Sequence, residues 1–289
     1  VCFVMLFFAV WDIALHGHGL PLPQRSDAPE PIPAEQPRWR RWEWWGLLGL
    51  TAATAVLSFT YLGDTTAPQN PLDATDTILT ETVTVEGNAV YLWSYPGISY
   101  GGSLKVTDEQ GTVLLVQELG YSTCFSWSES RLPVAAGETV TITVENAQLF
   151  ELAFRDGDGN LLPVTGGGAL FDEQAEVPDT ISQLNSMYFD EIYHGRTGYE
   201  QLHRLRVYET TPPPLGKDLI MVGIALFGMT GFGWRFSGTL FGVLLVPLAW
   251  CFARRLTRKR WIGAVAGVLL ALDFMRFAQS RIATIDIYG

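Results

Sequence analysis

The sequence has 289 residues, of which 48% are hydrophobic and only 17% charged, and its formal net charge at pH 7 is −11. The charge is divided unevenly. Residues 63–218 hold 23 acidic and 7 basic residues, a net charge of −16, whereas the rest of the chain has a net charge of +5. This division excludes a uniform soluble globule, and the lack of a concentrated basic face argues against nucleic-acid binding. The three cysteines are scattered and give neither a disulfide framework nor a zinc-binding spacing.

The chain begins inside an apolar run, without an initiator methionine or a charged flank, and it stops at Gly289 without a tail. The simplest interpretation is an N-terminal or internal fragment of a longer membrane protein. Residues 1–18 are then the truncated end of one transmembrane helix. Residues 19–43 are rich in proline and basic side chains and lack a hydrophobic period, which favours an extended cytoplasmic linker.

Three further segments, 44–62, 233–253 and 261–278, are apolar enough for transmembrane helices, which need about 20 mostly apolar residues. Buried helices of a soluble protein are the alternative. Basic residues precede the first span and fill the loop at 254–260 between the other two, and such clusters stay on the cytoplasmic side. The region between the first two spans is therefore expected outside the cytoplasm, at the plasma membrane. Residues 279–289 begin the next extracytoplasmic or membrane segment.

Residues 63–180 show the two-residue period of β-strands, because valine and isoleucine alternate with threonine around Val83 and Ile142. Turns at 108–111 and 156–160 separate further short apolar runs, as in hairpins. An extracytoplasmic antiparallel β-sandwich is expected. Calcium at the second turn is a weaker alternative, because the twelfth loop position lacks the glutamate that such a site needs. Several aromatic side chains of this region could also bind a sugar by stacking, although aromatic residues of a small sandwich are more often part of its core. They are Trp93, Tyr95, Tyr100, Tyr121, Phe125 and Trp127.

Residues 181–232 are dense in ionisable and aromatic side chains and are expected to form an extracytoplasmic catalytic loop with interfacial helices. On a helix, Asp190 and His194 would share one face, with Glu191 turned away. A carboxylate held in such a loop can act as a general base, although an isolated acidic pair is usually only solvated. Asp190, Glu191 and His194 are also residue types that commonly bind metal ions, so a metal site is an alternative for this segment.

Several short motifs follow one another in a fixed order. They are Phe189-Asp190-Glu191, Pro213-Pro214-Leu215-Gly216-Lys217, Phe232-Gly233-Trp234-Arg235, Asp273-Phe274-Met275, and Ser280-Arg281-Ile282 followed by Asp286. With these motifs, the stretch from Tyr188 to Gly289, together with the span at 44–62, resembles the protein O-mannosyltransferase family. This family belongs to the GT-C group of membrane glycosyltransferases, which use lipid-phosphate sugars. The β region lies outside the resemblance. The family usually has histidine where this sequence has Pro212.

The resemblance implies a polytopic α-helical membrane protein, here truncated, with the β-sandwich as an insertion. Its activity would be inverting transfer of mannose from a polyprenyl-phosphate-mannose donor to Ser or Thr hydroxyls of exported proteins. Asp190 would be the general base, and Glu191 would position the acceptor or tune Asp190. Cations bind a lipid phosphate through charge-assisted hydrogen bonds. The candidates are Arg235 and Arg281, which the resemblance favours, together with Arg196 and Lys217. Candidates near the acceptor are His194, Tyr193, Pro213, Pro214 and Asp286.

The lipid-linked sugar is a substrate, so no cofactor and no metal are expected. The expected partners are this donor, an exported acceptor protein and membrane lipids, and no nucleic acid. The fragment alone is expected to be inactive. Two alternatives remain open. One is a GT-C transferase with a glycan or lipid acceptor, and the other is a non-catalytic, membrane-anchored β-sandwich that binds sugars.

Overall fold

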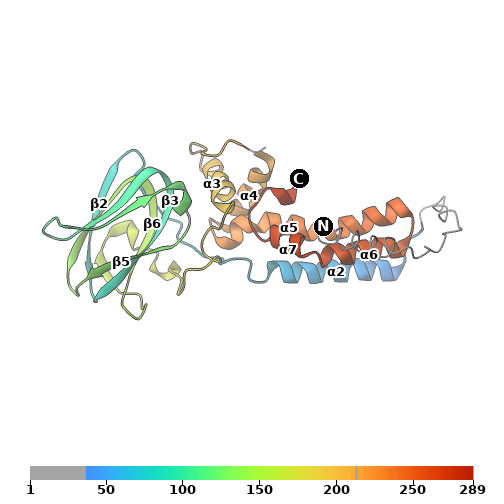
Figure 1. The fold of residues 1–289 in the computed structure, drawn as a ribbon, viewed down its shortest axis with the longest axis horizontal. Coiled ribbons are helices and arrows are strands. Elements are labelled where there is room, and N and C mark those ends of the chain that lie inside the picture. The colour runs from blue at the N-terminus through green and yellow to red at the C-terminus, as the bar shows by residue number, and fades with distance from the viewer. Residues whose placement is uncertain (1–36, 212–213, 289) are drawn as a thin grey trace, which may run out of the picture.

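The computed structural model describes residues 37–211 and 214–288. They form a β-sheet domain at one end of the molecule and a group of helices at the other (Figure 1). The expected helix at 1–18 and most of the linker at 19–43 lie outside the described residues. The helices are α2 (Arg41–Phe59), α3 (Glu191–Leu202), α4 (Pro214–Phe227), α5 (Gly231–Thr257), α6 (Arg260–Ala271) and α7 (Phe274–Ser280). The strands are β1 (Leu72–Asp73), β2 (Ile78–Val85), β3 (Ala89–Thr107), β4 (Val113–Leu119), β5 (Ser128–Val134), β6 (Thr139–Arg155) and β7 (Val164–Gly166).

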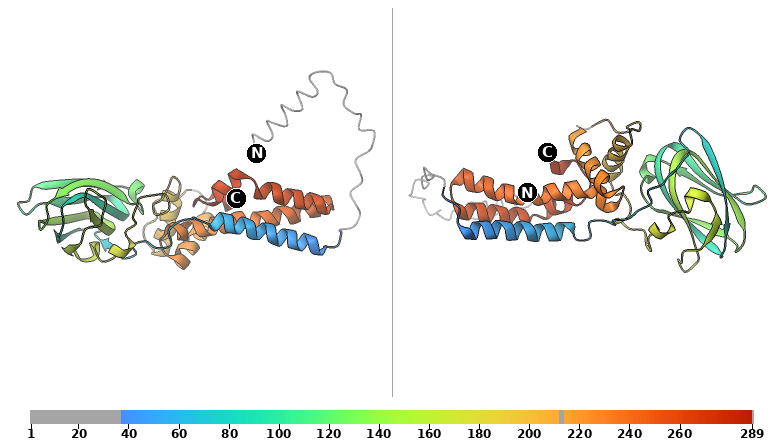
Figure 2. Two further views of the ribbon diagram at one scale, coloured as in Figure 1. Left: turned by 90° about the horizontal axis from the view of Figure 1, so that it is seen from below. Right: turned by 180° about the vertical axis from the view of Figure 1, so that it is seen from behind.

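The long helices α2, α5 and α6 lie side by side, and α3 and α4 stand between them and the sheet (Figures 1 and 2). A buried ion pair joins the start of α2 to the end of α5, where Arg254 Nε lies 2.6 Å from a carboxylate oxygen of Glu43. Arg260, at the start of α6, lies 3.4 Å from the other oxygen of Glu43. Two residues of the expected basic loop at 254–260 therefore hold the ends of the three helices together.

Among the described helices, α5 is the one long and apolar enough to cross a membrane, and its 27 residues extend over about 40 Å. α6 and α7 meet the same criterion only as a pair, and they are bent by 57° at the break between them. α2 lies where the span 44–62 was expected, but it does not meet the criterion. The helices by themselves therefore do not confirm a polytopic membrane protein.

The segment 261–278, expected as one helix, is broken at Asp273. α6 ends at Ala271, and the carboxylate of Asp273 accepts the backbone N–H of Met275 (3.0 Å) as the N-cap of α7. Such a local hydrogen bond competes with the continuous helix, which explains the break. Beyond it, Arg276 donates to the carbonyl oxygen of Gly242 in α5 (3.0 Å) and thereby ties α7 to α5.

The β domain is one antiparallel sheet of seven strands in the order β4-β3-β6-β2-β7, with β1 also paired to β6 and β5 to β3. The expected antiparallel strands and the turns at 108–111 and 156–160 are confirmed. The two-sheet sandwich is not confirmed, because the strands form one continuous sheet. Its long strands β3 and β6 change register near Pro96, Ser99 and Ser103. Such irregularities bend and twist paired strands, which allows one sheet to enclose a core.

The sheet contributes to two hydrophobic cores. The first lies within the β domain and contains the alternating residues of β2 and β6, such as Val83 and Ile142. The second joins the β domain to the helices, because Tyr95 and Phe125 pack in one cluster with Tyr199 of α3 and Trp234 of α5. Four of the six aromatic residues considered for sugar binding, Trp93, Tyr95, Phe125 and Trp127, are buried in this second core.

Two glycines allow the chain to cross closely where the segment after α2 meets the start of α5. A Cβ on Gly63 would lie 2.3 Å from the backbone carbon of Gly231, and a Cβ on Gly231 would lie 2.0 Å from the carbonyl oxygen of Leu184. Both contacts are with backbone atoms, which cannot move aside as a flexible side chain can. The crossing fixes the chain that leads into the β domain against the helix that carries Arg235.

Candidate functional site

Glu191, in the first turn of α3, is fully buried and paired with Arg235 of α5. Each of its carboxylate oxygens accepts two hydrogen bonds. One oxygen accepts from Arg235 Nε (2.6 Å) and from the backbone N–H of Ala283 (2.9 Å), and the other accepts from Arg235 Nη2 (2.6 Å) and the N–H of Tyr188 (3.0 Å). Glu191 thus has no lone pair left for an acceptor or a metal ion, and it joins three segments of the site.

Asp190 directly precedes Glu191 but has a different environment. It occupies the N-cap position of α3, its side chain makes no capping hydrogen bond, and it is partly exposed. Within the described residues, no hydrogen bond or ion pair of its carboxylate is found. The backbone turns sharply just before it, because Phe189 has a φ of 52°, an unusual conformation for an aromatic residue. The turn and the helix together fix the position of this partly exposed carboxylate.

His194 lies one turn further along α3 and is buried, with its Nδ1 unpaired within the described residues. Burial and the positive charge of Lys217 lower the pKa of His194, and the carboxylates of Asp190, Glu209 and Asp286 oppose this effect. The neutral imidazole is therefore favoured. The structure thus gathers charged side chains from α3, from the start of α4 and from the C-terminal segment around His194.

Lys217 of α4 is also buried, and burial lowers its pKa. Its ammonium donates to the carbonyl oxygens of Glu209 (2.8 Å) and Thr211, so it holds the segment that leads into α4. Pro214 begins α4 and is exposed, whereas Pro213 and Pro212 lie outside the described residues.

Arg196 faces the β domain. Its Nε lies 2.7 Å from a carboxylate oxygen of Glu200, both side chains are buried, and its guanidinium covers the ring of Tyr208 at 4.6 Å. Of the four cations expected to bind the donor phosphate, Arg196 and Lys217 are therefore engaged elsewhere in the loop.

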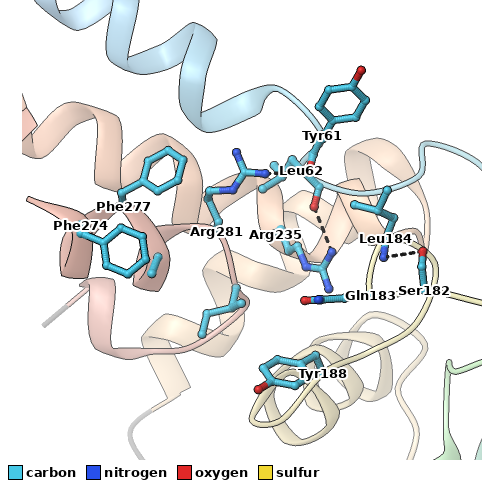
Figure 3. A pocket seen from close by; sticks show the side chains of 12 residues that line it. Tyr61, Leu62, Ser182, Gln183, Leu184, Tyr188, Arg235, Phe274, Phe277 and Arg281 are labelled. Carbon is cyan, nitrogen blue, oxygen red and sulfur yellow. Dashed lines mark hydrogen bonds between the residues drawn. The ribbon is translucent and has the colours of Figure 1, made fainter. Parts of the chain in front are cut away.

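Arg235 and Arg281 meet at one cavity of about 490 Å³ between the end of α2, the segment 182–188 and α7 (Figure 3). The wall also carries aromatic side chains, including Phe274 and Phe277, and Tyr188 lies on the side of the Asp190 segment. The sequence analysis did not select these aromatic residues, although Phe274 belongs to one of the motifs. The cavity combines apolar surface with guanidinium groups, which suits a phosphate joined to a hydrocarbon chain.

The two guanidinium groups at this cavity differ in whether a carboxylate neutralises their charge. Arg235 is neutralised by Glu191 and also donates to the carbonyl oxygen of Leu62 (3.0 Å). Arg281 donates only to carbonyl oxygens at the end of α2, among them those of Ser58 (3.0 Å) and Tyr61 (2.7 Å). No carboxylate lies within ion-pair distance of Arg281 in the described part of the chain. Arg281 is therefore the guanidinium at this cavity that has no carboxylate partner among the described residues.

A cation site is not formed by Asp190, Glu191 and His194, because Glu191 is saturated. Among the described residues, the one group of three carboxylates close enough to share an ion is Glu151, Asp172 and Glu173 in the β domain, with ligand oxygens within 4.8 Å of one another. Glu151 and Glu173 already accept N–H groups of the protein. The group is separate from the Asp190 loop.

Comparison with known proteins gives this arrangement its context. Residues 179–288 match the family model described as dolichyl-phosphate-mannose-protein mannosyltransferase. The chain is 40% identical over 114 residues to the polyprenol-phosphate-mannose–protein mannosyltransferase of Mycobacterium tuberculosis, covering 37% of this chain and 22% of that protein. It is 41% identical over 107 residues to the protein of the same name from Mycolicibacterium smegmatis, covering 35% and 20%. Protein O-mannosyltransferase 1 of Drosophila melanogaster is 27% identical over 115 residues, covering 34% and 13%.

The matched residues 179–288 include Asp190, Glu191, Arg235 and Arg281. This match to the dolichyl-phosphate-mannose-protein mannosyltransferase family confirms the resemblance drawn from the motifs. The chain spans about a fifth of the length of the bacterial relatives it matches. Among solved structures, a glycoside hydrolase of family 32 from Bifidobacterium adolescentis matches with 12% identity and a TM-score of 0.24, covering 41% of this chain and 18% of that one. A likeness this weak indicates neither a shared fold nor a shared function.

Proposed function

We propose that the protein transfers mannose from a polyprenyl-phosphate-mannose donor to Ser or Thr hydroxyls of exported proteins, with Asp190 as the general base. The observation that carries the proposal is the unpartnered carboxylate of Asp190 beside a saturated Glu191, within the family domain. A base must be able to reach the substrate proton, and Asp190 is the member of the pair whose oxygens are available. Glu191 then acts as a positioning residue for Asp190.

In the proposed step, the acceptor hydroxyl oxygen attacks C1 of the mannosyl group while the bond from C1 to the phosphate oxygen breaks. The electron pair of that bond leaves with the polyprenyl phosphate, and the hydroxyl proton passes to Asp190. Attack from the side opposite the leaving group inverts the configuration at C1. The phosphate leaves without protonation, so the step needs no general acid, and the proposal includes no cofactor or metal ion.

The cavity with Arg235 and Arg281 is proposed to bind the donor phosphate. Arg281 contributes the uncompensated charge, and charge-assisted hydrogen bonds to phosphate are stronger than neutral ones. The leaving phosphate gains negative charge as the bond breaks, so a fixed cation there stabilises the transition state more than the bound donor. The aromatic wall at Phe274 and Phe277 is proposed to contact the first part of the polyprenyl chain.

The orientation of the site is proposed from charge. Arg38, Arg40, Arg41 and the basic residues at 254–260 are placed at the cytoplasmic side, and the acidic region 63–232 is placed outside the plasma membrane. Polyprenyl-linked sugars and exported acceptors would then meet on the outer side. Because the chain covers a fifth of its bacterial relatives, we also propose that it is inactive without the parts of those proteins that it does not match.

The test is mannosyl transfer in membranes that contain the full-length parent protein. The reaction contains radiolabelled polyprenyl-phosphate-mannose and a Thr-containing acceptor peptide, and it compares wild type, Asp190→Asn and the exposed-turn control Asp158→Asn. Label should reach the peptide with wild type and Asp158→Asn, and Asp190→Asn should lower the rate at least a hundredfold. Full activity of Asp190→Asn would remove Asp190 as the base. Label in a lipid or glycan fraction, with none in peptide, would replace the protein acceptor.

A further inference from the structure

A second cavity, of about 530 Å³, lies between the β domain and the loop that follows α3. Its wall comes from three segments: residues 99–101 in the middle of β3, residues 120–121 after β4, and residues 206–208 between α3 and α4. The first two segments belong to the β domain, which the family model does not match, and the third lies within the match. The cavity therefore exists only because the β domain is present.

Buried charged groups contact the wall of this cavity and hold it in place. Glu200 accepts the backbone N–H of Tyr208 at 2.9 Å. Arg196, paired with Glu200, lies under the ring of Tyr208 and donates to the carbonyl oxygen of Ser99 at 3.4 Å. These contacts give the Arg196–Glu200 pair a role outside the donor cavity. The pair fixes the loop after α3 against β3, so the cavity is already formed before a ligand binds.

An aromatic strip leads from the cavity to the proposed base. The rings of Tyr208 and Tyr121 are stacked with centroids 5.4 Å apart, and Tyr121 lies 5.8 Å from the ring of Tyr193. Tyr193 follows Asp190 by three residues and lies on the first turn of α3. Tyr121 is 42% exposed and Tyr208 is 50% exposed, so part of each side chain faces solvent at the cavity.

The length and chemistry of the strip fit an extended polypeptide. The ring-to-ring distances from Tyr193 to Tyr121 and from Tyr121 to Tyr208 together span at most the length of about three residues of an extended chain, at about 3.3 Å per residue. Tyrosine rings bind apolar and planar groups of many side chains, and their hydroxyls and the guanidinium of exposed Arg206 can bond to peptide carbonyl oxygens. Gly101 and Gly120 leave backbone open in the wall.

We propose that this cavity is an acceptor subsite supplied by the β domain. It would bind the segment of the acceptor polypeptide that lies about three to four residues from the Ser or Thr at Asp190. The inference rests on the proposed function and adds a determinant of acceptor choice that the mannosyltransferase domain alone does not contain. Tyr121 is the residue of the β domain that contacts both the cavity and the strip.

The experiment measures transfer to two acceptor peptides with the same central Thr. The long peptide has five residues on each side of the Thr, and the short one has a single capped residue on each side. Wild type is compared with Tyr121→Ala, with Tyr121→Phe, which keeps the ring, and with Val116→Ala, an exposed change on β4 outside the cavity. Removing the ring should raise KM for the long peptide about five- to tenfold and leave KM for the donor unchanged.

The short peptide, which cannot reach Tyr121, should be modified equally by all four proteins. Val116→Ala should match wild type with both peptides, and Tyr121→Phe should have a KM for the long peptide between those of wild type and Tyr121→Ala. Equal losses with long and short peptides in Tyr121→Ala would indicate a structural role and overturn the subsite. Unchanged KM for the long peptide in Tyr121→Ala would also overturn it.

Three further outcomes separate this subsite from the proposed function and from a sugar site. If wild type transfers to neither peptide, the proposed function fails and the subsite fails with it. If wild type is active and Asp190→Asn is not, an unchanged Tyr121→Ala variant rejects the subsite alone. Competition by soluble mannobiose against the long peptide, lost in Tyr121→Ala, would reject a peptide subsite in favour of a sugar site.

Discussion

Glu191 and Arg235, 44 residues apart in the sequence, form a buried ion pair in which two guanidinium nitrogens each lie 2.6 Å from a different carboxylate oxygen. The pair joins the first turn of α3 to the first turns of α5. The neighbouring Asp190 has no such partner within the described residues. Two adjacent carboxylates that look equivalent in the sequence are thus separated into a structural group and an accessible one.

This separation predicts opposite effects of two similar substitutions. Glu191→Gln leaves Arg235 buried without a counter-charge, which should lower the free energy of unfolding by about 3–5 kcal/mol. Asp190→Asn removes a partly exposed carboxylate without a partner and should leave the melting temperature unchanged while activity is lost. Thermal melting of the purified protein in detergent measures both. Equal melting of Glu191→Gln and wild type would contradict the structural role of the pair.

Arg281 should affect the donor more than the acceptor. Arg281→Lys keeps a positive charge but loses the planar group that bonds several carbonyl oxygens and a phosphate together. We expect KM for polyprenyl-phosphate-mannose to rise about tenfold, which corresponds to about 1.4 kcal/mol, with KM for the peptide unchanged. Arg131→Lys, an exposed change on β5, is the matched control and should have no effect. A rise confined to KM for the peptide would reject Arg281 as the donor cation.

Glu151 should make the stability of the β domain depend on pH. Burial, with Asp172 and Glu173 nearby, raises its pKa from 4.5 to about 8, although N–H groups of Gln174 and Glu173 oppose this shift. Between these two values the unfolded chain releases a proton that the folded domain keeps. Stability is therefore complete below about pH 4.5, falls as pH rises towards 8, by at most about 1.4 kcal/mol per unit, and is constant above.

Glu151→Gln tests this dependence, because the amide has nearly the same shape and does not ionise. The melting temperature of wild type should fall more steeply between pH 5 and pH 8 than that of the variant, and the variant should be the more stable at pH 8. Parallel curves for the two proteins would show that Glu151 ionises normally in the folded domain.

The crossing at Gly231 should not tolerate a methyl group. Gly231→Ala places its Cβ against the carbonyl oxygen of Leu184, so the chain must shift, and we expect a loss of about 3 kcal/mol or more together with reduced transfer. Gly49→Ala is the matched control, because no atom lies within 4 Å of its added Cβ in α2. That change should be neutral or stabilising, since alanine favours a helix by about 1 kcal/mol over glycine. Equal stability of the two variants would contradict a tight crossing.

The strands were predictable, because alternation around Val83 and Ile142 reflects one buried face and one solvated face. The fate of the aromatic residues was not. Trp93 and Tyr121 were both considered as sugar-binding aromatic residues, yet the first is buried and the second exposed, because α3–α5 cover only part of the sheet. Burial of this kind depends on contacts between distant segments, which a local pattern does not contain.

The site was predictable where motifs carried it, and Arg235 and Arg281 do lie at one cavity. The pairing of Glu191 was not predictable, because adjacent carboxylates give no indication of which one turns inward. The break at Asp273 could have been found, since an aspartate within an apolar run is a common helix N-cap. Its hydrogen bond to Met275 is what divides the expected span.

The aromatic cluster shared by Tyr95, Phe125, Tyr199 and Trp234 means that the β domain and the helices α3 and α5 share one hydrophobic core. Removing the β domain would expose the hydrophobic surface of α3 and α5 to solvent, next to the proposed base. The β domain and the loop that holds Asp190 should therefore melt in a single cooperative transition. If Tyr121 binds the acceptor as proposed, acceptor binding should also reduce the mobility of the Asp190 loop, because both pack against this shared core.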